Sequence, residues 1–204
     1  MTERIADRKM RFGGILENPY ISQWQRDLLD GGRVEGLCRA LSPYPYESLL
    51  DVGCGLGEGA ILQRGLYAGI DNSAPRVSFA SGKYREAAFV IADALRLPFG
   101  EKTFDMVMMV DASHHLLDEQ IAPAVREMVR VGRKHIVLSD PVIVPGQSRL
   151  SAFFYSLDRG ACFRTVEQMK SLLGAIPAVK LKDIREFRTT PGLYVHAAFI
   201  LEII

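Results

Sequence analysis

The chain has 204 residues, of which 48% are hydrophobic and 24% charged, enough for one sizeable core but not for a second catalytic domain. Its 25 basic and 24 acidic residues give a formal net charge of +1, so we expect no electrostatic field that gathers nucleic acid or a membrane surface. The cysteines Cys38, Cys54 and Cys162 are odd in number and lack metal-ligand spacing, which supports neither a disulfide framework nor a metal site.

The start of the chain predicts helices rather than a targeting segment. Its first ten residues carry five charged side chains, and no run in the chain approaches the roughly 18 apolar residues of a membrane helix. We therefore expect a cytoplasmic protein, monomeric or homodimeric, without a membrane partner. Residues 18–42 are predicted to form one or two helices, which Pro43 and Pro45 end.

Short strand-like and helix-like segments then alternate, a pattern typical of an α/β fold with a parallel sheet covered on both faces. Strands are predicted near 47–53, 66–71, 87–92, 104–110 and 134–139, and helices near 57–64, 74–82 and 118–132. The last two strands, near 179–187 and 193–203, are predicted to form a hairpin.

The first of these strands ends in Asp51 and runs into glycines at 53, 55 and 57. Such a turn suits a backbone that lies against a ligand, because a side chain would block the turn or the approach of the ligand. The dinucleotide fingerprint would need a glycine at position 58, which is Glu58, and no Gly-Lys-Ser/Thr follows for a phosphate loop. The turn therefore favours a nucleoside ligand without phosphates, with Cys54 as a small filler.

Three further strands end in acidic residues. Asp71 comes eighteen residues after Gly53, where a carboxylate can accept the hydroxyl hydrogens of a ribose. Together with the glycine turn, these segments resemble class I S-adenosylmethionine-dependent methyltransferases. The resemblance implies S-adenosyl-L-methionine as the cofactor, an adenine contact for Asp93, and a cofactor site made of Asp51, Gly53, Cys54, Gly55, Gly57, Asp71, Asn72, Asp93, Ala94 and Asp111.

Nearly the whole chain resembles small bacterial methyltransferases related to the ubiquinone/menaquinone C-methylase group, most closely at the glycine turn, at residues 93–99 and at Phe104-Asp105. That resemblance implies a Rossmann-like three-layer sandwich with a seven-stranded, mostly parallel sheet and an antiparallel last strand. It implies a single domain over 1–204, divided into an N-terminal helical lid (1–45), a cofactor-binding core (46–140), a substrate cap (141–175) and a C-terminal hairpin (176–204). In such a lid, Arg11 would meet the methionine carboxylate.

The residues that would bind the methyl acceptor are less well defined by the sequence. The aromatic-rich cap, with Phe154 and Tyr155, is either the roof of a substrate pocket or the core of two short helices. Methyl transfer is an in-line displacement that depends mainly on positioning. An acceptor that needs a base has His114, His115 and Asp140 as candidates, with His115 preferred over His114.

Other sequence patterns exclude some classes of methyl acceptor without identifying the acceptor. The Asn/Asp-Pro-Pro-aromatic motif of adenine and glutamine methylases is absent after 104–110, so we expect a small-molecule acceptor, methylated on oxygen or carbon, and no nucleic acid. Two alternatives remain open: a non-catalytic S-adenosylmethionine-binding or regulatory protein, and an NAD(P)-dependent oxidoreductase.

Overall fold

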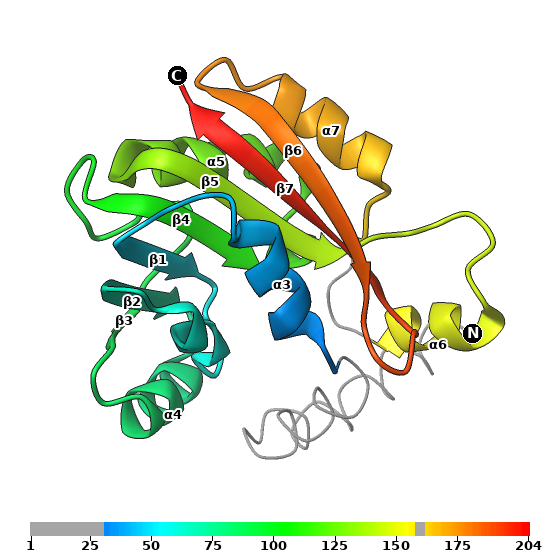
Figure 1. Ribbon diagram of the computed structural model, residues 1–204, viewed down its shortest axis with the longest axis horizontal. Coiled ribbons are helices and arrows are strands. Elements are labelled where there is room, and N and C mark those ends of the chain that lie inside the picture. Colours follow the sequence, from blue (N-terminus) through cyan, green and yellow to red (C-terminus); the bar gives the residue numbers. More distant parts are fainter. Residues whose placement is uncertain (1–30, 158–161) are drawn as a thin grey trace.

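The computed structural model describes residues 31–157 and 162–204, and seven strands form one sheet in the order β3-β2-β1-β4-β5-β7-β6 (Figure 1). The strands are β1 (Ser48–Val52), β2 (Leu66–Asp71), β3 (Ala88–Ile91), β4 (Phe104–Val110), β5 (Gly132–Pro141), β6 (Val179–Arg188) and β7 (Val195–Ile203). β1 to β5 pair in parallel, whereas β7 is antiparallel to both β5 and β6. The predicted α/β fold, its hairpin and its antiparallel last strand are confirmed.

Helices cover both faces of the sheet (Figure 1). The α-helices are α3 (Arg33–Leu41), α4 (Ala74–Lys83), α5 (Asp118–Val131), α6 (Arg149–Leu157) and α7 (Val166–Gly174), and two short 3-10 helices are η1 (Glu58–Leu62) and η2 (Ser113–His115). One hydrophobic cluster joins the sheet to α5 and α7, and a second joins its other face to α3. Both clusters are needed because parallel strands are buried on both faces.

Periodic apolar residues explain how the helices dock. α5 buries Ile121, Ala124, Val125 and Met128, whose spacing places them on one face of a helix. α3 ends at Leu41, just before Pro43, in agreement with the predicted stop. The helix predicted over 57–64 is wrong: this segment is only the short 3-10 helix η1.

The shortness of η1 has a local cause. Gly57 precedes it with a φ of 80°, and Gln63 ends it with a ψ of 129°, so neither flanking residue extends a helix. Glycines at 57, 59 and 65 also disfavour helical backbone over this stretch. The connection from β1 to β2 therefore stays short, and the glycine turn lies close to the start of β2.

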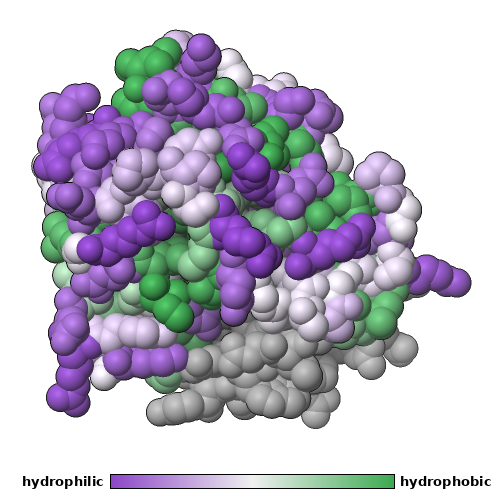
Figure 2. Space-filling model, viewed as in Figure 1, coloured by the Kyte–Doolittle hydropathy of each residue, from purple (hydrophilic) through white to green (hydrophobic). Residues whose placement is uncertain are grey.

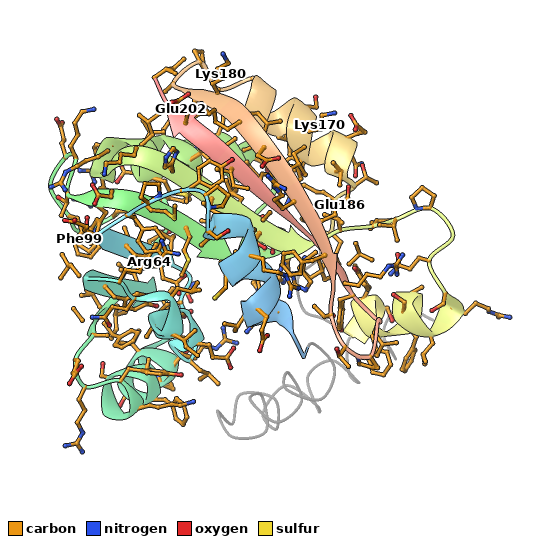
Figure 3. The ribbon with its side chains drawn as sticks, in the orientation of Figure 1. Arg64, Phe99, Lys170, Lys180, Glu186 and Glu202 are labelled. Atoms are coloured by element: carbon orange, nitrogen blue, oxygen red, sulfur yellow. The ribbon has the colours of Figure 1, made fainter. Side chains whose placement is uncertain are left out.

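The surface is mixed in polarity. On the face shown in Figure 2, polar side chains surround several apolar patches. The edge strand β6 exposes Lys180 and Glu186, which Figure 3 labels along its length, and Lys182 forms an ion pair with Glu202 of β7 at 3.1 Å. Charged side chains protect an exposed sheet edge from pairing with another strand.

Among residues 31–157 and 162–204, no helix has both the length and the apolar character that crossing a bilayer requires.

Candidate active site

The glycine turn, residues 53–57, follows β1 in a backbone conformation that only glycine adopts at low cost. Gly53, Gly55 and Gly57 have φ values of 77°, 54° and 80°, all in the left-handed region. The amides of Gly53 and Cys54 both donate to the carbonyl of Ile70 in β2, each at 2.8 Å. The alternating glycines thus let the chain fold back onto the neighbouring strand.

Close packing also excludes side chains from this turn. A Cβ atom on Gly53 would lie 2.6 Å from Cβ of Ala112, and one on Gly57 would lie 2.9 Å from Cβ of Ala80 and from the Phe89 ring. The turn is consequently fixed against the loop after β4 on one side and against α4 and β3 on the other.

Asp71 is attached to the glycine turn by main-chain hydrogen bonds. One carboxylate oxygen accepts from the Gly55 amide at 3.0 Å and the other from the Ser73 amide at 2.8 Å. Asp71 is only 6% exposed, and each carboxylate oxygen has a second lone pair for another donor. Asp71 is therefore held in one orientation with acceptor capacity remaining.

The strand order brings the predicted residues to one edge of the sheet. Asp93, Asp71, Gly53 and Asp111 follow the carboxyl ends of β3, β2, β1 and β4, which are consecutive neighbours. Asp93 is exposed, and its carboxylate accepts from the Leu95 amide at 2.9 Å. Also at this edge, Asn72 is exposed and Ala94 half-buried. Arg11 lies outside the described residues.

Asp51 is a buried carboxyl beneath this edge. It is 3% exposed, and the Tyr67 hydroxyl donates to its Oδ2 at 2.8 Å, while Oδ1 accepts no hydrogen bond within the described part of the chain. Burial raises the pKa of Asp51 to about 7, against the lowering effects of Tyr67 and Arg33. The nearby Cys54 thiol is buried as well, and burial raises its pKa.

An arginine that the sequence did not single out completes this region. Arg33, at the start of α3, is 8% exposed and contacts the carboxylates of Glu58 and Asp111. Burial alone would raise the pKa of Asp111, but Arg33 and then His196 outweigh it and lower this pKa to about 2. Arg33 is 78 residues from Asp111 in sequence, so no local motif could have identified it.

Asp111 itself has an unusual backbone. Its φ of 51° is in the left-handed region, which non-glycine residues rarely occupy and which occurs frequently at ligand sites. Its Oδ1 lies 3.4 Å from Nδ1 of the buried His196. Asp111, directly after β4, thus combines an uncommon backbone conformation with an ionised side chain next to the glycine turn.

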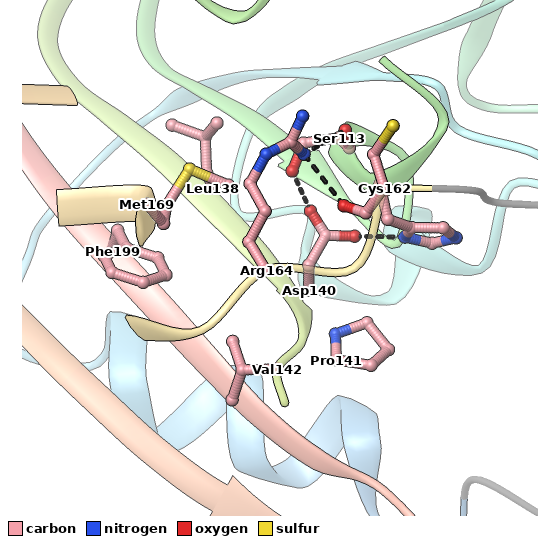
Figure 4. Close-up of a pocket in the computed structure, with 10 residues that line it drawn as sticks. Ser113, Leu138, Asp140, Pro141, Val142, Cys162, Arg164, Met169 and Phe199 are labelled. Atoms are coloured by element: carbon pink, nitrogen blue, oxygen red, sulfur yellow. Dashed lines mark hydrogen bonds and ion pairs between the residues drawn. The ribbon is translucent and has the colours of Figure 1, made fainter. Parts of the chain in front are cut away.

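A second cluster is centred on what we call the histidine turn, residues 113–116, which contains η2. Nδ1 of His114 lies 2.5 Å from Oδ1 of Asp140, and the Ser113 hydroxyl donates to the other Asp140 oxygen (Figure 4). His114 and Asp140 are 4% and 5% exposed. A carboxylate on Nδ1 orients an imidazole for proton transfer, as in catalytic His-Asp pairs.

Arg164, which sequence reasoning also missed, lies in the same small pocket as this pair (Figure 4). It precedes α7 and forms hydrogen bonds to main-chain carbonyls of the histidine turn. The pocket is further lined by Leu138, Pro141, Val142, Cys162, Met169 and Phe199.

The other acceptor-side candidates have different surroundings. His115 is exposed, and its ring centroid lies 4.2 Å from that of His114. Tyr155 of α6 is 9% exposed and donates its hydroxyl to the Val142 carbonyl at 3.0 Å, whereas Phe154 is half-buried. Tyr155 thus packs α6 against the end of β5.

A family model described as a methyltransferase domain matches residues 50–138. The O-methyltransferase cnsE of Penicillium expansum is 34% identical over 113 residues, which are 50% of this chain and 41% of that protein. The norajmaline N-methyltransferase of Rauvolfia serpentina is 32% identical over 149 residues, 67% of this chain and 42% of that protein. The chain therefore spans less than half the length of these curated relatives.

Among solved structures, magnesium protoporphyrin IX methyltransferase of Synechocystis PCC 6803 with bound S-adenosylhomocysteine has a TM-score of 0.69 at 17% identity, over 93% of this chain and 96% of that chain. Such low identity shows the fold alone. The fold, the glycine turn and the family match agree with one another. These findings identify a class I S-adenosylmethionine-dependent methyltransferase domain, which the family model matches over residues 50–138 of the chain.

Proposed function

We propose that this protein transfers the methyl group of S-adenosylmethionine to an oxygen or carbon atom of a small-molecule acceptor. The observation that carries the proposal is the attachment of Asp71 to the glycine turn through the Gly55 amide at 3.0 Å. This bond places an oriented hydroxyl acceptor next to a backbone that excludes side chains, the combination that a ribose requires.

The residues present fit the cofactor. Asp71 would hold the ribose, Asp93 the adenine amino group, and the glycine turn would lie against the nucleoside. Asp51 and Asp111 each have a buried carboxylate oxygen without a hydrogen bond from the described residues, which suits the ammonium group of the methionine half, and Arg33 suits its carboxylate. The bound cofactor supplies a methyl group made electrophilic by its sulfonium charge.

The histidine turn supplies the acid-base chemistry in this proposal. Asp140 holds Nδ1 of His114 at 2.5 Å, so the imidazole has a defined orientation for removing a proton from the acceptor. We place His114 ahead of His115, because Asp140 orients the buried His114 imidazole, whereas His115 is exposed. A positioned base favours acidic acceptors, such as phenols, enols and carbon acids, over amines that are already nucleophilic.

Isothermal titration calorimetry with S-adenosylhomocysteine, with NADH as the control, tests the cofactor assignment. We expect micromolar binding of the nucleoside and none of NADH. Replacing Asp71 with Ala should weaken binding by roughly 1–3 kcal/mol, because a charged acceptor is lost. Absence of binding in folded protein would refute the proposal, and binding of NADH would instead favour an oxidoreductase.

Methyl transfer itself is tested with S-adenosylmethionine carrying a labelled methyl group and a panel of phenolic, hydroxylated and carbon-acid acceptors. Once one acceptor is found, His114→Gln should lower the rate about 10²–10⁴-fold, while His115→Gln, the matched control, should change it little. Binding of the cofactor without labelling of any acceptor would favour the non-catalytic alternative.

A further inference from the structure

We infer that Arg164 is a positioning residue that connects the segment before α7 to the histidine turn and thereby fixes the imidazole of His114 for proton transfer. The inference rests on the proposed function, in which His114 is the base. Arg164 forms no hydrogen bond with the glycine turn in the described structure. It acts only through the geometry of residues 113–116.

The guanidinium of Arg164 holds both ends of the histidine turn. Nη1 donates to the Ser113 carbonyl at 3.1 Å, and Nη2 donates to the Leu116 carbonyl at 2.7 Å. Nε donates to Asp118, the first residue of α5, at 2.8 Å. Two of these acceptors are the ends of the turn, and the third is the start of α5. Arg164 therefore fixes the position of the turn relative to α5.

The chemistry of arginine suits this role better than that of lysine. Arg164 is 5% exposed, and Nη1 also donates to the Cys162 carbonyl at 3.1 Å. A planar guanidinium directs several donors at fixed angles, whereas an ammonium group has one nitrogen and no fixed plane. A lysine at this position keeps the charge but cannot hold Ser113, Leu116 and Asp118 at once.

Arg164 does not act alone, since the two residues before it reach the same turn. The Cys162 amide donates to the His114 carbonyl at 3.1 Å. The Phe163 ring stacks on the His114 imidazole, with centroids 4.9 Å apart and planes inclined by 14°. The main chain, a ring and a guanidinium thus converge on His114 from the segment that leads into α7.

Helix α6 and the chain after β5 are attached to this segment in turn. The Tyr155 ring of α6 lies 4.7 Å from that of Phe163, and the Arg164 carbonyl accepts from the Ile143 amide at 3.0 Å. A continuous series of contacts therefore leads from α6 through Phe163 and Arg164 to His114. An acceptor that displaces α6 would change the orientation of the base through these contacts.

The chain contains a matched control in Arg130 of α5. Its guanidinium also donates to two main-chain carbonyls, those of Leu97 and Phe99 at 2.9 and 2.8 Å, and to the Glu127 carboxylate at 2.8 Å. Leu97 and Phe99 lie in the connection between β3 and β4, and Glu127 lies in α5 one turn before Arg130. Arg130→Lys therefore reproduces the loss of a carbonyl-binding arginine without affecting His114 directly.

The test is ¹⁵N NMR of the histidine side chains in the full chain, with the His114 signals assigned by His114→Gln. In its neutral form, wild-type His114 should hold its proton on Nδ1, facing Asp140. In Arg164→Lys, the two ring nitrogens should shift toward each other as both tautomers become populated. Arg130→Lys should leave the His114 signals at the wild-type positions, even where it lowers the melting temperature.

Folded Arg164→Lys protein with wild-type His114 signals would overturn the inference. If that variant does not fold, Asp118→Ala replaces the test, because it removes one partner of Arg164 at a side chain that is 69% exposed. A smaller shift in the same direction supports the inference, and unchanged signals overturn it.

The NMR measurement needs neither an acceptor nor the cofactor, so failure of the proposed methyl transfer is detected separately. With an acceptor available, Arg164→Lys should lower kcat about 10–100-fold with unchanged affinity for S-adenosylhomocysteine, as expected for misplacement of a base.

Discussion

The glycine turn and the histidine turn lie at the same edge of the sheet but are stabilised in opposite ways. The glycine turn is a main-chain structure whose partners, Ile70 and Asp71, come from the adjacent strand. The histidine turn depends on side chains from distant segments, with Asp140 26 residues and Arg164 about 50 residues away from it. The first should therefore be sensitive to added atoms, and the second to lost charges and hydrogen bonds.

Gly53→Ala should produce the largest effect, because it combines a left-handed φ of 77° with a Cβ atom 2.6 Å from that of Ala112. We expect a loss of about 3–5 kcal/mol in stability, with loss of S-adenosylhomocysteine binding. Gly146→Ala separates the two causes, since Gly146 has a φ of 73° and nothing within 4 Å of its added Cβ. Thermal unfolding measures the stability of both variants, and calorimetry measures their binding. If Gly53→Ala bound S-adenosylhomocysteine as the wild type does, the glycine turn would not be sensitive to added atoms.

Asp51→Asn should change the pH dependence of stability. The folded pKa of Asp51 is raised from 3.8 to about 7, so the folded state binds the proton more tightly and loses stability as the pH rises from about 4 to 7. The total is on the order of 4 kcal/mol. The neutral variant should lack this loss and unfold at higher denaturant concentration than wild type at pH 8. A difference in unfolding free energy between the two proteins that is the same at pH 4 and at pH 8 would contradict the prediction.

Asp140→Asn should weaken the histidine turn without affecting the glycine turn. An amide has one acceptor oxygen where the carboxylate has two, so the Ser113 hydroxyl and the His114 ring cannot both keep their present hydrogen bonds, at a cost of about 1–3 kcal/mol. Binding of S-adenosylhomocysteine should be unchanged, because Asp140 does not contact the glycine turn in the described structure. Denaturant unfolding and calorimetry on the same sample check both parts, and weakened binding would show that the two turns are coupled.

Gly82→Ala should give the smallest effect, with the opposite sign. Gly82 lies in α4 with an ordinary helical backbone and nothing within 4 Å of an added Cβ, so alanine should stabilise the protein by about 0.5–1 kcal/mol. A rise in melting temperature with unchanged cofactor binding would show that the requirement for glycine is confined to the turn. A fall would show that α4 has constraints that its geometry does not reveal.

The same contrast explains which expectations from the sequence succeeded. The strands near 66–71 and 104–110 were predicted with their observed bounds, because continuous apolar runs between turn residues are local signals. The helix predicted over 57–64 failed because the backbone of Gly57 and the glycines at 59 and 65 outweighed its apolar residues. Arg33 and Arg164 were missed because an isolated arginine carries no pattern of its own.

By itself, the sequence determined the α/β fold and the position of the glycine turn, because glycine spacing and apolar periodicity act over a few residues. Only the tertiary structure decided which side chains meet at the acceptor side. Pairing of β4 with β5 brings the histidine turn to Asp140, and the segment before α7 brings Arg164 to both ends of that turn. The physical reason is that buried charges and polar groups select partners by distance in space, after strand order has set which distant segments become neighbours.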